Sequence, residues 1–198
     1  YQHNPYGIAW GNTHWGHAVS KDLVHWQNLG VALVPDDTGT MYSGSAVTDI
    51  EGRAGFGKGA HLLFYTAAGD RIVAPRGGPV PRTQRIAWST DGRTYTKVAK
   101  PAVMPCPEAN RDPKVVWHAP SGTWAMVVYG NAERDYHTYA FYSSKDLLNW
   151  EKTSVFRGDK KKQGSFCFEC PDFFELPIEG EDGRRWVLAD AHGTYVVG

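Results

Sequence analysis

Ser20-Lys21-Asp22-Leu23-Val24-His25-Trp26 is a short stretch that recurs twice more along this chain. The later copies are Ser89-Thr90-Asp91-Gly92-Arg93-Thr94-Tyr95 and Ser144-Lys145-Asp146-Leu147-Leu148-Asn149-Trp150. All three read Ser-x-Asp, three further residues and an aromatic side chain. Ser and Asp favour the turn of a hairpin because their side chains can bond the nearby backbone. The stretch therefore predicts a β-hairpin that repeats along the chain.

Short apolar segments surround each copy and predict the strands of a repeated unit. Those next to the copies are 16–19, 86–88 and 139–142 on one side and 26–33, 95–98 and 150–156 on the other. Further upstream lie a second set, 61–66, 124–129 and 186–189, and an opening set, 44–49, 113–118 and 171–176. No copy follows residues 186–189. Each unit thus has four strands and repeats about every 60 residues.

Four-stranded units without a helical period predict an all-β fold, a β-propeller. The predicted divisions are residues 1–38 for the rest of a first blade without its innermost strand, 39–100 for the second blade, 101–157 for the third and 158–198 for part of a fourth. Two blades are then complete and two are partial. Because a propeller of fewer than four blades is not expected, we interpret the chain as one incomplete domain.

Composition excludes some partners. Lys+Arg and Asp+Glu balance at 21 each, so we expect neither a nucleic acid nor a membrane surface as partner. No apolar run is long enough for a transmembrane helix. The 8 Trp and 10 Tyr suit strands and also offer flat surfaces for sugar rings. The cysteines Cys106, Cys167 and Cys170 include a lone Cys-x-x-Cys without a second ligand pair, so no metal and no cofactor are expected.

One position is shared by three predicted innermost strands. When Pro113 is aligned with Gly44 and Pro171, the preceding dipeptides fall into one slot, namely Tyr42-Ser43, Arg111-Asp112 and Glu169-Cys170. Innermost strands lie next to the propeller axis, so these residues are expected to converge on one pocket. Most glycosidases use two carboxylates that flank the bond to be cleaved, so two carboxylates in one small pocket indicate this chemistry. Taken singly, Arg111-Asp112 also fits an ordinary ion pair, and Glu169 fits a turn residue.

Five motifs, taken in order, resemble glycoside hydrolase family 32, the β-fructofuranosidases that include invertases, inulinases and levanases. They are Tyr1-Gln2-His3-Asn4-Pro5, Trp15-Gly16-His17-Ala18-Val19-Ser20-Lys21-Asp22-Leu23-Val24-His25-Trp26, Tyr42-Ser43-Gly44-Ser45-Ala46, Arg111-Asp112-Pro113-Lys114-Val115 and Glu169-Cys170-Pro171-Asp172. The resemblance implies a five-bladed propeller, usually followed by a β-sandwich, that cleaves terminal β-fructosyl linkages with retention.

The resemblance also implies roles for individual residues. Glu169 matches the general acid/base, and Asp112 matches the carboxylate that holds fructose hydroxyls and stabilises the transition state. Arg111 is expected to keep Asp112 ionised by its opposite charge. The positions that match contacts to the fructosyl unit are Gln2, Trp10, Tyr42, which is commonly Phe in the family, and Ser43; Cys170 would lie beside the acid/base.

The family's nucleophile is the Asp of an Asn-Asp-Pro motif on the innermost strand of the first blade. That motif does not occur in these 198 residues, and Asn4-Pro5 lacks the Asp. We therefore expect the isolated chain to be an inactive part of the catalytic propeller.

Three functions fit these observations. The first is a retaining hydrolase acting on terminal β-D-fructofuranosyl linkages of levan, inulin or sucrose. The second is a fructosyltransferase of the same fold, and the third is a non-catalytic carbohydrate-binding propeller. The partner is in each case a fructose-containing oligo- or polysaccharide. A polymeric substrate favours a secreted or periplasmic protein, whereas the sequence leaves the oligomeric state open.

Overall fold

The computed structural model describes residues 1–69, 81–103, 110–131, 133–159, 161, 167–180 and 182–198. Within these ranges the chain forms fourteen β-strands and one short 3-10 turn, η1 (Ala119–Ser121), and no α-helix. None of its helical segments is long and apolar enough to cross a membrane. The all-β prediction is confirmed. Cys106, one of the three cysteines considered as metal ligands, lies outside the described residues.

Two three-stranded sheets lie at the ends of the chain, and both are antiparallel throughout. The first contains β1 (Gln2–His3), β2 (His14–Ser20) and β3 (Trp26–Leu33). The last contains β12 (Asp172–Pro177), β13 (Arg184–Ala189) and β14 (Tyr195–Val197).

Two four-stranded antiparallel sheets lie between them. One contains β4 (Met41–Asp49), β5 (Ala60–Ala67), β6 (Thr83–Ser89) and β7 (Thr96–Lys97). The other contains β8 (Arg111–His118), β9 (Thr123–Gly130), β10 (Tyr136–Ser144) and β11 (Glu151–Asp159). The predicted strands are all present, with ends that differ by up to three residues. Most are longer than predicted because pairing continues into polar positions, whereas β7 is shorter than the predicted 95–98.

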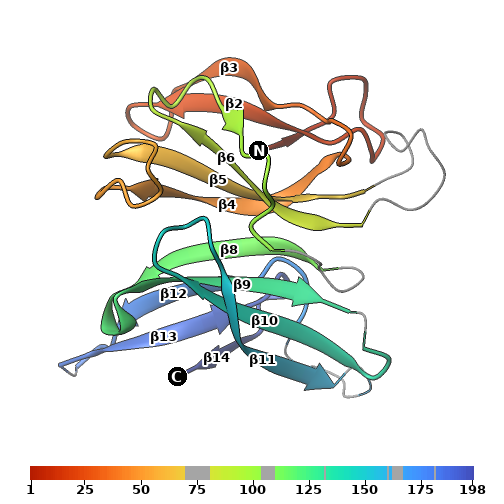
Figure 1. The fold of residues 1–198 in the computed structure, drawn as a ribbon. Helices are drawn as coiled ribbons and strands as arrows, with labels where there is room; N and C mark the ends of the chain where they lie inside the picture. Colours follow the sequence, from red (N-terminus) through yellow and green to blue (C-terminus); the bar gives the residue numbers. More distant parts are fainter. Residues whose placement is uncertain (70–80, 104–109, 132, 160, 162–166, 181) are drawn as a thin grey trace.

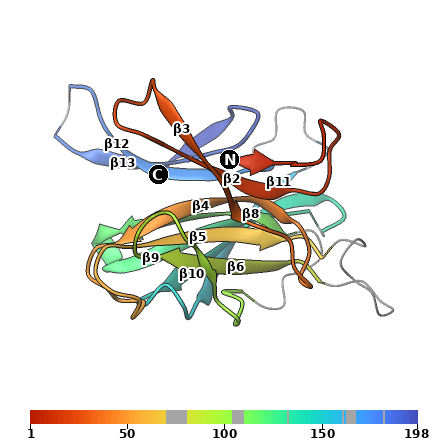
Figure 2. The same cartoon turned by 90° about the horizontal axis from the view of Figure 1, so that it is seen from above.

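The four sheets follow an arc. Figure 1 shows the first three sheets one below another in chain order, with β12, β13 and β14 overlapping the third sheet in that view. Figure 2, a view turned by 90°, shows β12 and β13 on the same side as β2 and β3, whereas β5, β6, β9 and β10 lie on the other side. Such an arc is what neighbouring propeller blades form. The number of five blades and the blade limits given above stay predictions.

The repeated Ser-x-Asp stretch forms the turn that was predicted. In the third copy, Ser144 Oγ donates to Asp146 Oδ1 (3.0 Å), and the same oxygen accepts the backbone N–H groups of Leu148 and Asn149 at 2.9 and 2.7 Å. The other two copies have the same bonds at Asp22 and Asp91. The residue after each Asp has a left-handed φ of 61–65°, and these residues are Leu23, Gly92 and Leu147.

A fourth Asp-capped turn joins β13 to β14. Asp190 Oδ1 accepts the N–H groups of His192 (2.9 Å) and Thr194 (3.1 Å). As predicted, no copy of the Ser-x-Asp stretch follows residues 186–189, because position 188 is Leu and Tyr195 comes one residue later than the pattern requires. The pattern therefore could not reveal this different turn, which Asp190 caps alone.

Close packing of β4 and β8 holds the centre of the molecule together. Ser45 Oγ donates to Pro113 O (2.8 Å) and accepts the N–H of Val115 (3.0 Å), which ties the two innermost strands across the sheet boundary. The largest apolar cluster fills the space beside them and includes Phe64, Met126 and Leu147. The two paired strands bring Tyr42-Ser43 of β4 and Arg111-Asp112 of β8 close together.

Candidate active site

Both innermost strands interrupt their pairing at the predicted slot. In β4 the register shifts between Met41 and Gly44, and in β8 it shifts between Arg111 and Lys114. Such bulges re-aim side chains and are common beside active sites. At Gly44 the backbone of β5 comes so close that an added Cβ would lie 1.9 Å from Phe64 O. The slot therefore has the same local construction in two neighbouring sheets.

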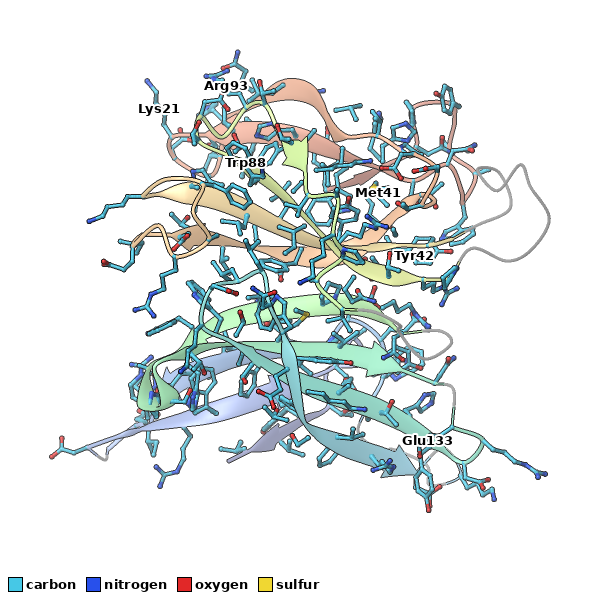
Figure 3. All side chains as sticks on the ribbon, in the orientation of Figure 1. Lys21, Met41, Tyr42, Trp88, Arg93 and Glu133 are labelled. Atoms are coloured by element: carbon cyan, nitrogen blue, oxygen red, sulfur yellow. The ribbon has the colours of Figure 1, made fainter. Side chains whose placement is uncertain are left out.

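A pocket of about 210 Å³ opens at this end of the strands. Figure 3 labels Tyr42 at that end, on the right of the view. The lining includes every site residue predicted from the sequence, together with Thr13: Gln2, Trp10, Thr13, Tyr42, Ser43, Arg111, Asp112, Glu169 and Cys170. The structure thus brings together residues that lie up to 168 positions apart in the chain.

Asp112 is the buried carboxylate of the pocket, with 7% of its surface exposed. Its φ of 61° is left-handed, a conformation that Asp tolerates better than most residues and that clusters at functional sites. Its N–H donates to Thr66 Oγ1 (3.0 Å), and this hydroxyl donates to buried Gln84 (2.7 Å). A polar network behind the strand therefore fixes the backbone of Asp112.

Burial raises the pKa of Asp112 above its ordinary value of 3.8. The N–H of Cys170, 3.2 Å from Oδ2, and the charge of Arg111 act in the opposite direction without outweighing burial. Arg111 thus acts in the predicted direction, toward the ionised form of Asp112, but burial has the larger effect. Arg111 Nε lies 3.9 Å from Asp112 Oδ2, which is beyond hydrogen-bonding distance.

Arg111 has a closer partner in Glu169. Its Nε donates to Glu169 Oε1 at 3.0 Å, and its Nη2 donates to the same oxygen. The guanidinium also lies over the ring of Tyr129, with Cζ 4.6 Å from the ring centroid. Arg111 is therefore held between an aromatic face and two carboxylates, an arrangement that suits a planar, permanently charged group.

Glu169 is positioned by its neighbours in the chain. The ring of Phe168 stacks on His192 at 3.9 Å, and Tyr139 Oη donates to Phe168 O at 2.6 Å. The backbone oxygen of Glu169 accepts the N–H of Ala191 at 3.0 Å. Its side chain keeps 40% of its surface exposed. Unlike Asp112, which is buried, Glu169 therefore has a fixed backbone and a side chain that is partly exposed to solvent.

Cys170 lies between the acids. Its thiol is 3.6 Å from Asp112 Oδ2, to which it donates. Burial, followed by the charge of Asp112, raises the pKa of Cys170 to about 11, so the sulfur stays a neutral thiol at neutral pH. Like Asp112, it has a left-handed φ, of 53°. Its role in the pocket is that of a weak donor and not that of a nucleophile.

The remaining predicted residues form the rim. Gln2 Nε2 donates to Ser43 Oγ at 3.2 Å, which joins the first strand to β4. Trp10 packs edge-on against Tyr42 at 5.9 Å and has 81% of its surface exposed. Trp15 Nε1 donates to Tyr42 O at 3.0 Å and so fixes this strand end. The rim therefore offers amide, hydroxyl and indole groups to a polar ligand.

Two features of the pocket were missed by the sequence reasoning. Thr13 is 7% exposed, and its Oγ1 is buried without a hydrogen-bond partner in the described part of the chain. Tyr129, from β9, lies under Arg111, and burial raises its pKa to about 12. Neither residue is in an innermost-strand slot. Thr13 could have been suspected from its place between Trp10 and Trp15, whereas Tyr129 carries no sequence signal.

The arrangement suits acid/base chemistry on a neutral polar ligand. One carboxylate is exposed enough to exchange a proton, a second is buried, and a cation lies beside both. Within the ranges that the structure describes, no group of three or more His, Cys, Asp or Glu side chains could hold a metal ion.

The family model for the glycosyl hydrolases family 32 N-terminal domain matches residues 1–194. The chain belongs to glycosyl hydrolase family 32. This confirms the resemblance that the five motifs carry.

Named relatives of this family 32 chain cleave fructose-containing sugars. The levanase of Bacillus subtilis is 43% identical over 204 residues, which cover 100% of this chain and 28% of the levanase. The extracellular exo-inulinase of Aspergillus niger is 36% identical over 213 residues, covering 95% of this chain and 38% of that enzyme. The chain thus spans well under half the length of these relatives.

Solved structures of family 32 share the fold. The exo-inulinase of Aspergillus awamori superposes with a TM-score of 0.75 at 34% identity, covering 94% of this chain and 40% of that one. The fructofuranosidase of Schwanniomyces occidentalis complexed with fructose gives 0.75 at 32% identity, covering 99% and 39%.

Proposed function

We propose that the protein hydrolyses terminal β-D-fructofuranosyl linkages of levan, inulin or sucrose with retention of configuration. The observation that carries this proposal is the pocket in which Glu169, Asp112 and Arg111 meet. Its rim of amide, hydroxyl and indole groups suits the hydroxyls and the apolar face of a sugar ring. Relatives with levanase and exo-inulinase activity support the same substrate class.

In this mechanism Glu169 is the general acid/base. Its proton goes to the glycosidic oxygen as the bond from the fructosyl C2 atom breaks, and the leaving sugar departs as an alcohol. The carboxylate then takes a proton from water as that water attacks C2 and releases fructose. The exposed carboxylate of Glu169, fixed through Phe168 and Ala191, supports this assignment because it can reach both leaving group and water.

Asp112 binds the fructosyl ring. A buried carboxylate accepts two sugar hydroxyls well, and its negative charge stabilises the positive charge that develops on the ring in the transition state. Arg111 neutralises part of the charge when both carboxylates are ionised. Gln2, Trp10, Tyr42 and Ser43 contact the same sugar unit in this proposal, and Cys170 donates to Asp112.

The nucleophile of the proposal is a further aspartate, in the Asn-Asp-Pro sequence that these 198 residues do not include. Its carboxylate would attack C2 while Glu169 protonates the leaving oxygen, which forms the covalent fructosyl intermediate that retention requires. Asp112 is not the nucleophile, because it is buried and already accepts donors from Cys170.

Fructose release from sucrose, inulin and levan by the full-length protein tests the proposal. Trapping the intermediate with methanol should give the methyl β-fructofuranoside, since two inversions restore the starting configuration. Free fructose as the main product supports hydrolysis. Longer fructosyl oligosaccharides from concentrated sucrose would show a transferase, whereas binding without turnover would show a carbohydrate-binding propeller. Either of these last two results would overturn the proposal.

A further inference from the structure

A second pocket lies at the opposite end of the strands from the candidate active site. It has a volume of about 360 Å³ and is lined by residues from the end of β4, the loop after it and the strand ends on either side of the β8–β9 turn: Thr48, Asp49, Ile50, Glu51, Arg53, Trp117 and Trp124. The β4–β5 loop and this turn are on the left of Figure 1, whereas Tyr42 is labelled on the right of Figure 3, which has the same orientation. The two pockets are therefore separate.

Two tryptophans form the apolar wall of this second pocket. The rings of Trp117 and Trp124 pack edge-on at 5.3 Å with an interplanar angle of 70°. Trp117 is half-buried, and the Arg53 guanidinium lies over its ring, 4.7 Å from the centroid. Aromatic faces bordered by polar groups are typical surfaces for sugar rings, which have apolar C–H faces and hydroxyl edges.

Trp124 supplies the observation that points to a ligand. It is 8% exposed, and its Nε1 is buried without a hydrogen-bond partner in the part of the chain that the structure describes. A buried N–H without an acceptor is unusual and costs free energy. The equivalent group of Trp150 has an acceptor, Leu147 O, at 2.9 Å. A ligand hydroxyl or ether oxygen would supply the acceptor that Trp124 lacks.

The charged groups of the second pocket favour a neutral ligand. Asp49 is fully buried, and its carboxylate accepts the N–H groups of Arg53 (3.0 Å) and Ala54 (2.8 Å). Glu51 and Arg53 are both exposed and bring one negative and one positive charge to the edge of the pocket. Because the Asp49 carboxylate is already bonded to backbone N–H groups, the two charges open to a ligand offset each other, which suits hydroxyl groups better than an anion or a cation.

We propose that the second pocket is a fructan-binding site, which holds a remote part of a polymer whose end is in the active site or is bound independently of it. This proposal rests on the proposed function, because the fructan ligand is the substrate of the proposed hydrolase. One sugar unit stacks on Trp117 beside Arg53, and a small movement of the Trp124 ring on binding brings its buried Nε1 to a hydroxyl of the same unit. Such a site raises the local concentration of polymer without touching the reacting atoms.

Comparison of two substrates tests the proposal. In the full-length protein, Trp117→Ala should lower kcat/KM for levan or inulin by at least about threefold and leave kcat/KM for sucrose unchanged, because sucrose needs the active site alone. Trp88→Leu is the matched control, since Trp88 is half-buried, stacks on Phe56 at 4.6 Å and does not line the pocket. It should leave the polymer-to-sucrose ratio of kcat/KM unaltered.

Direct binding provides the second readout. Calorimetric titration of the Glu169→Gln protein with levan oligosaccharides should show two classes of site, and adding Trp124→Phe, which keeps an aromatic ring but removes the N–H donor, should weaken one of them. Trp150→Phe, which removes a bonded indole N–H elsewhere, should weaken neither. If Trp117→Ala does not fold, as judged by circular dichroism, Arg53→Gln at the exposed edge replaces it.

The outcomes separate the two proposals. A wild-type protein that releases no fructose even from sucrose would overturn the proposed function. The second site alone would be overturned by a different result. In that case the wild-type protein cleaves both sucrose and polymer, Trp117→Ala or Arg53→Gln leaves the polymer-to-sucrose ratio of kcat/KM unchanged, and the titration shows one class of site. A lowered ratio with two classes of site would support it.

Discussion

Arg111 Nε lies 3.0 Å from Glu169 Oε1, so the arginine from the first residue of β8 is bonded to the acid that precedes β12. The two residues are 58 positions apart in the sequence, and Glu169 lies just before the first strand of the sheet that follows the sheet of Arg111 along the chain. Because Arg111 also lies beside Asp112, one guanidinium connects the two carboxylates that the proposed mechanism uses. The charge state of the pocket therefore depends on this residue.

Replacement of Arg111 by Lys tests that dependence. Lys keeps the charge but loses the planar fork that bonds Glu169 and the flat face that stacks on Tyr129. Arg111→Lys should lower kcat/KM for sucrose about 100-fold, the typical cost of one misplaced electrostatic group in an active site. Steady-state kinetics measure this. A value within about threefold of wild type would show that charge alone suffices.

Asp112→Asn should separate activity from stability. The substitution removes the negative charge that the mechanism places against the fructosyl ring, so fructose release should fall by at least about 100-fold. The same substitution removes a buried charge, and its shape is nearly unchanged. The melting temperature at pH 7 should therefore rise. An unchanged rate of fructose release would remove Asp112 from the transition state.

The stability gain of Asp112→Asn has a defined pH dependence. The pKa of Asp112 is raised in the folded protein above 3.8, so the folded state holds the proton more tightly than the unfolded state. Ionisation above that pKa destabilises the wild type, and at low pH both states are protonated. The melting-temperature difference should thus be largest at neutral pH and vanish at about pH 3. A difference that grows on acidification would contradict the burial argument.

In the repeated turns the pKa of the Asp is lowered, so the pH dependence of stability is opposite to that of Asp112. Hydrogen bonds from the N–H groups of Thr94 and Arg93 lower the pKa of Asp91 to about 2 from 3.8. Its contribution to stability is therefore complete above about pH 4 and is lost as the pH falls toward about 2. Asp91→Asn should reduce the acid sensitivity of the melting temperature over that range. An identical pH profile in wild type and variant would refute a role for the ionised turn.

Thr13→Val tests the unpartnered hydroxyl in the pocket. A buried hydroxyl without a partner costs free energy, so the nearly isosteric Val should raise the free energy of unfolding by about 1 kcal/mol. Thr66→Val is the control, because Thr66 Oγ1 both accepts from Asp112 N and donates to Gln84. That variant should be less stable than wild type. Denaturant titration distinguishes them, and a destabilised Thr13→Val protein would contradict this account.

Local chemistry explains why the fold could be predicted from the sequence. The Ser-x-Asp turns depend on contacts between residues two to four positions apart, so their sequence repeats wherever the turn repeats. The slot before Gly44 and Pro113 could be aligned because both strands bulge at that point. The family motifs then supplied the roles that local chemistry does not specify.

Long-range electrostatics could not be predicted in the same way. Adjacency in sequence suggested that Arg111 pairs with Asp112, and the two groups do lie 3.9 Å apart. The hydrogen bonds of Arg111, however, go to Glu169, which the sequence did not indicate. The burial that raises the pKa of Asp112 comes from packing between sheets. Trp117 and Trp124 likewise look like ordinary strand residues until the turn between β8 and β9 brings them to one pocket.

Glu169 carries the proton transfers of the proposed function, and Glu175 provides the control for its replacement. Glu175 is an acid of β12 whose Oε2 pairs with Arg184 Nε at 2.7 Å, outside the pocket. Glu175→Gln should therefore leave the rate of fructose release unchanged.

The most direct test is kcat for sucrose in the Glu169→Gln protein, measured together with the Kd for sucrose. The amide cannot protonate the leaving oxygen or activate water, so kcat should fall about 1,000-fold while Kd changes by less than about threefold. A Glu169→Gln protein with near wild-type kcat would contradict the account.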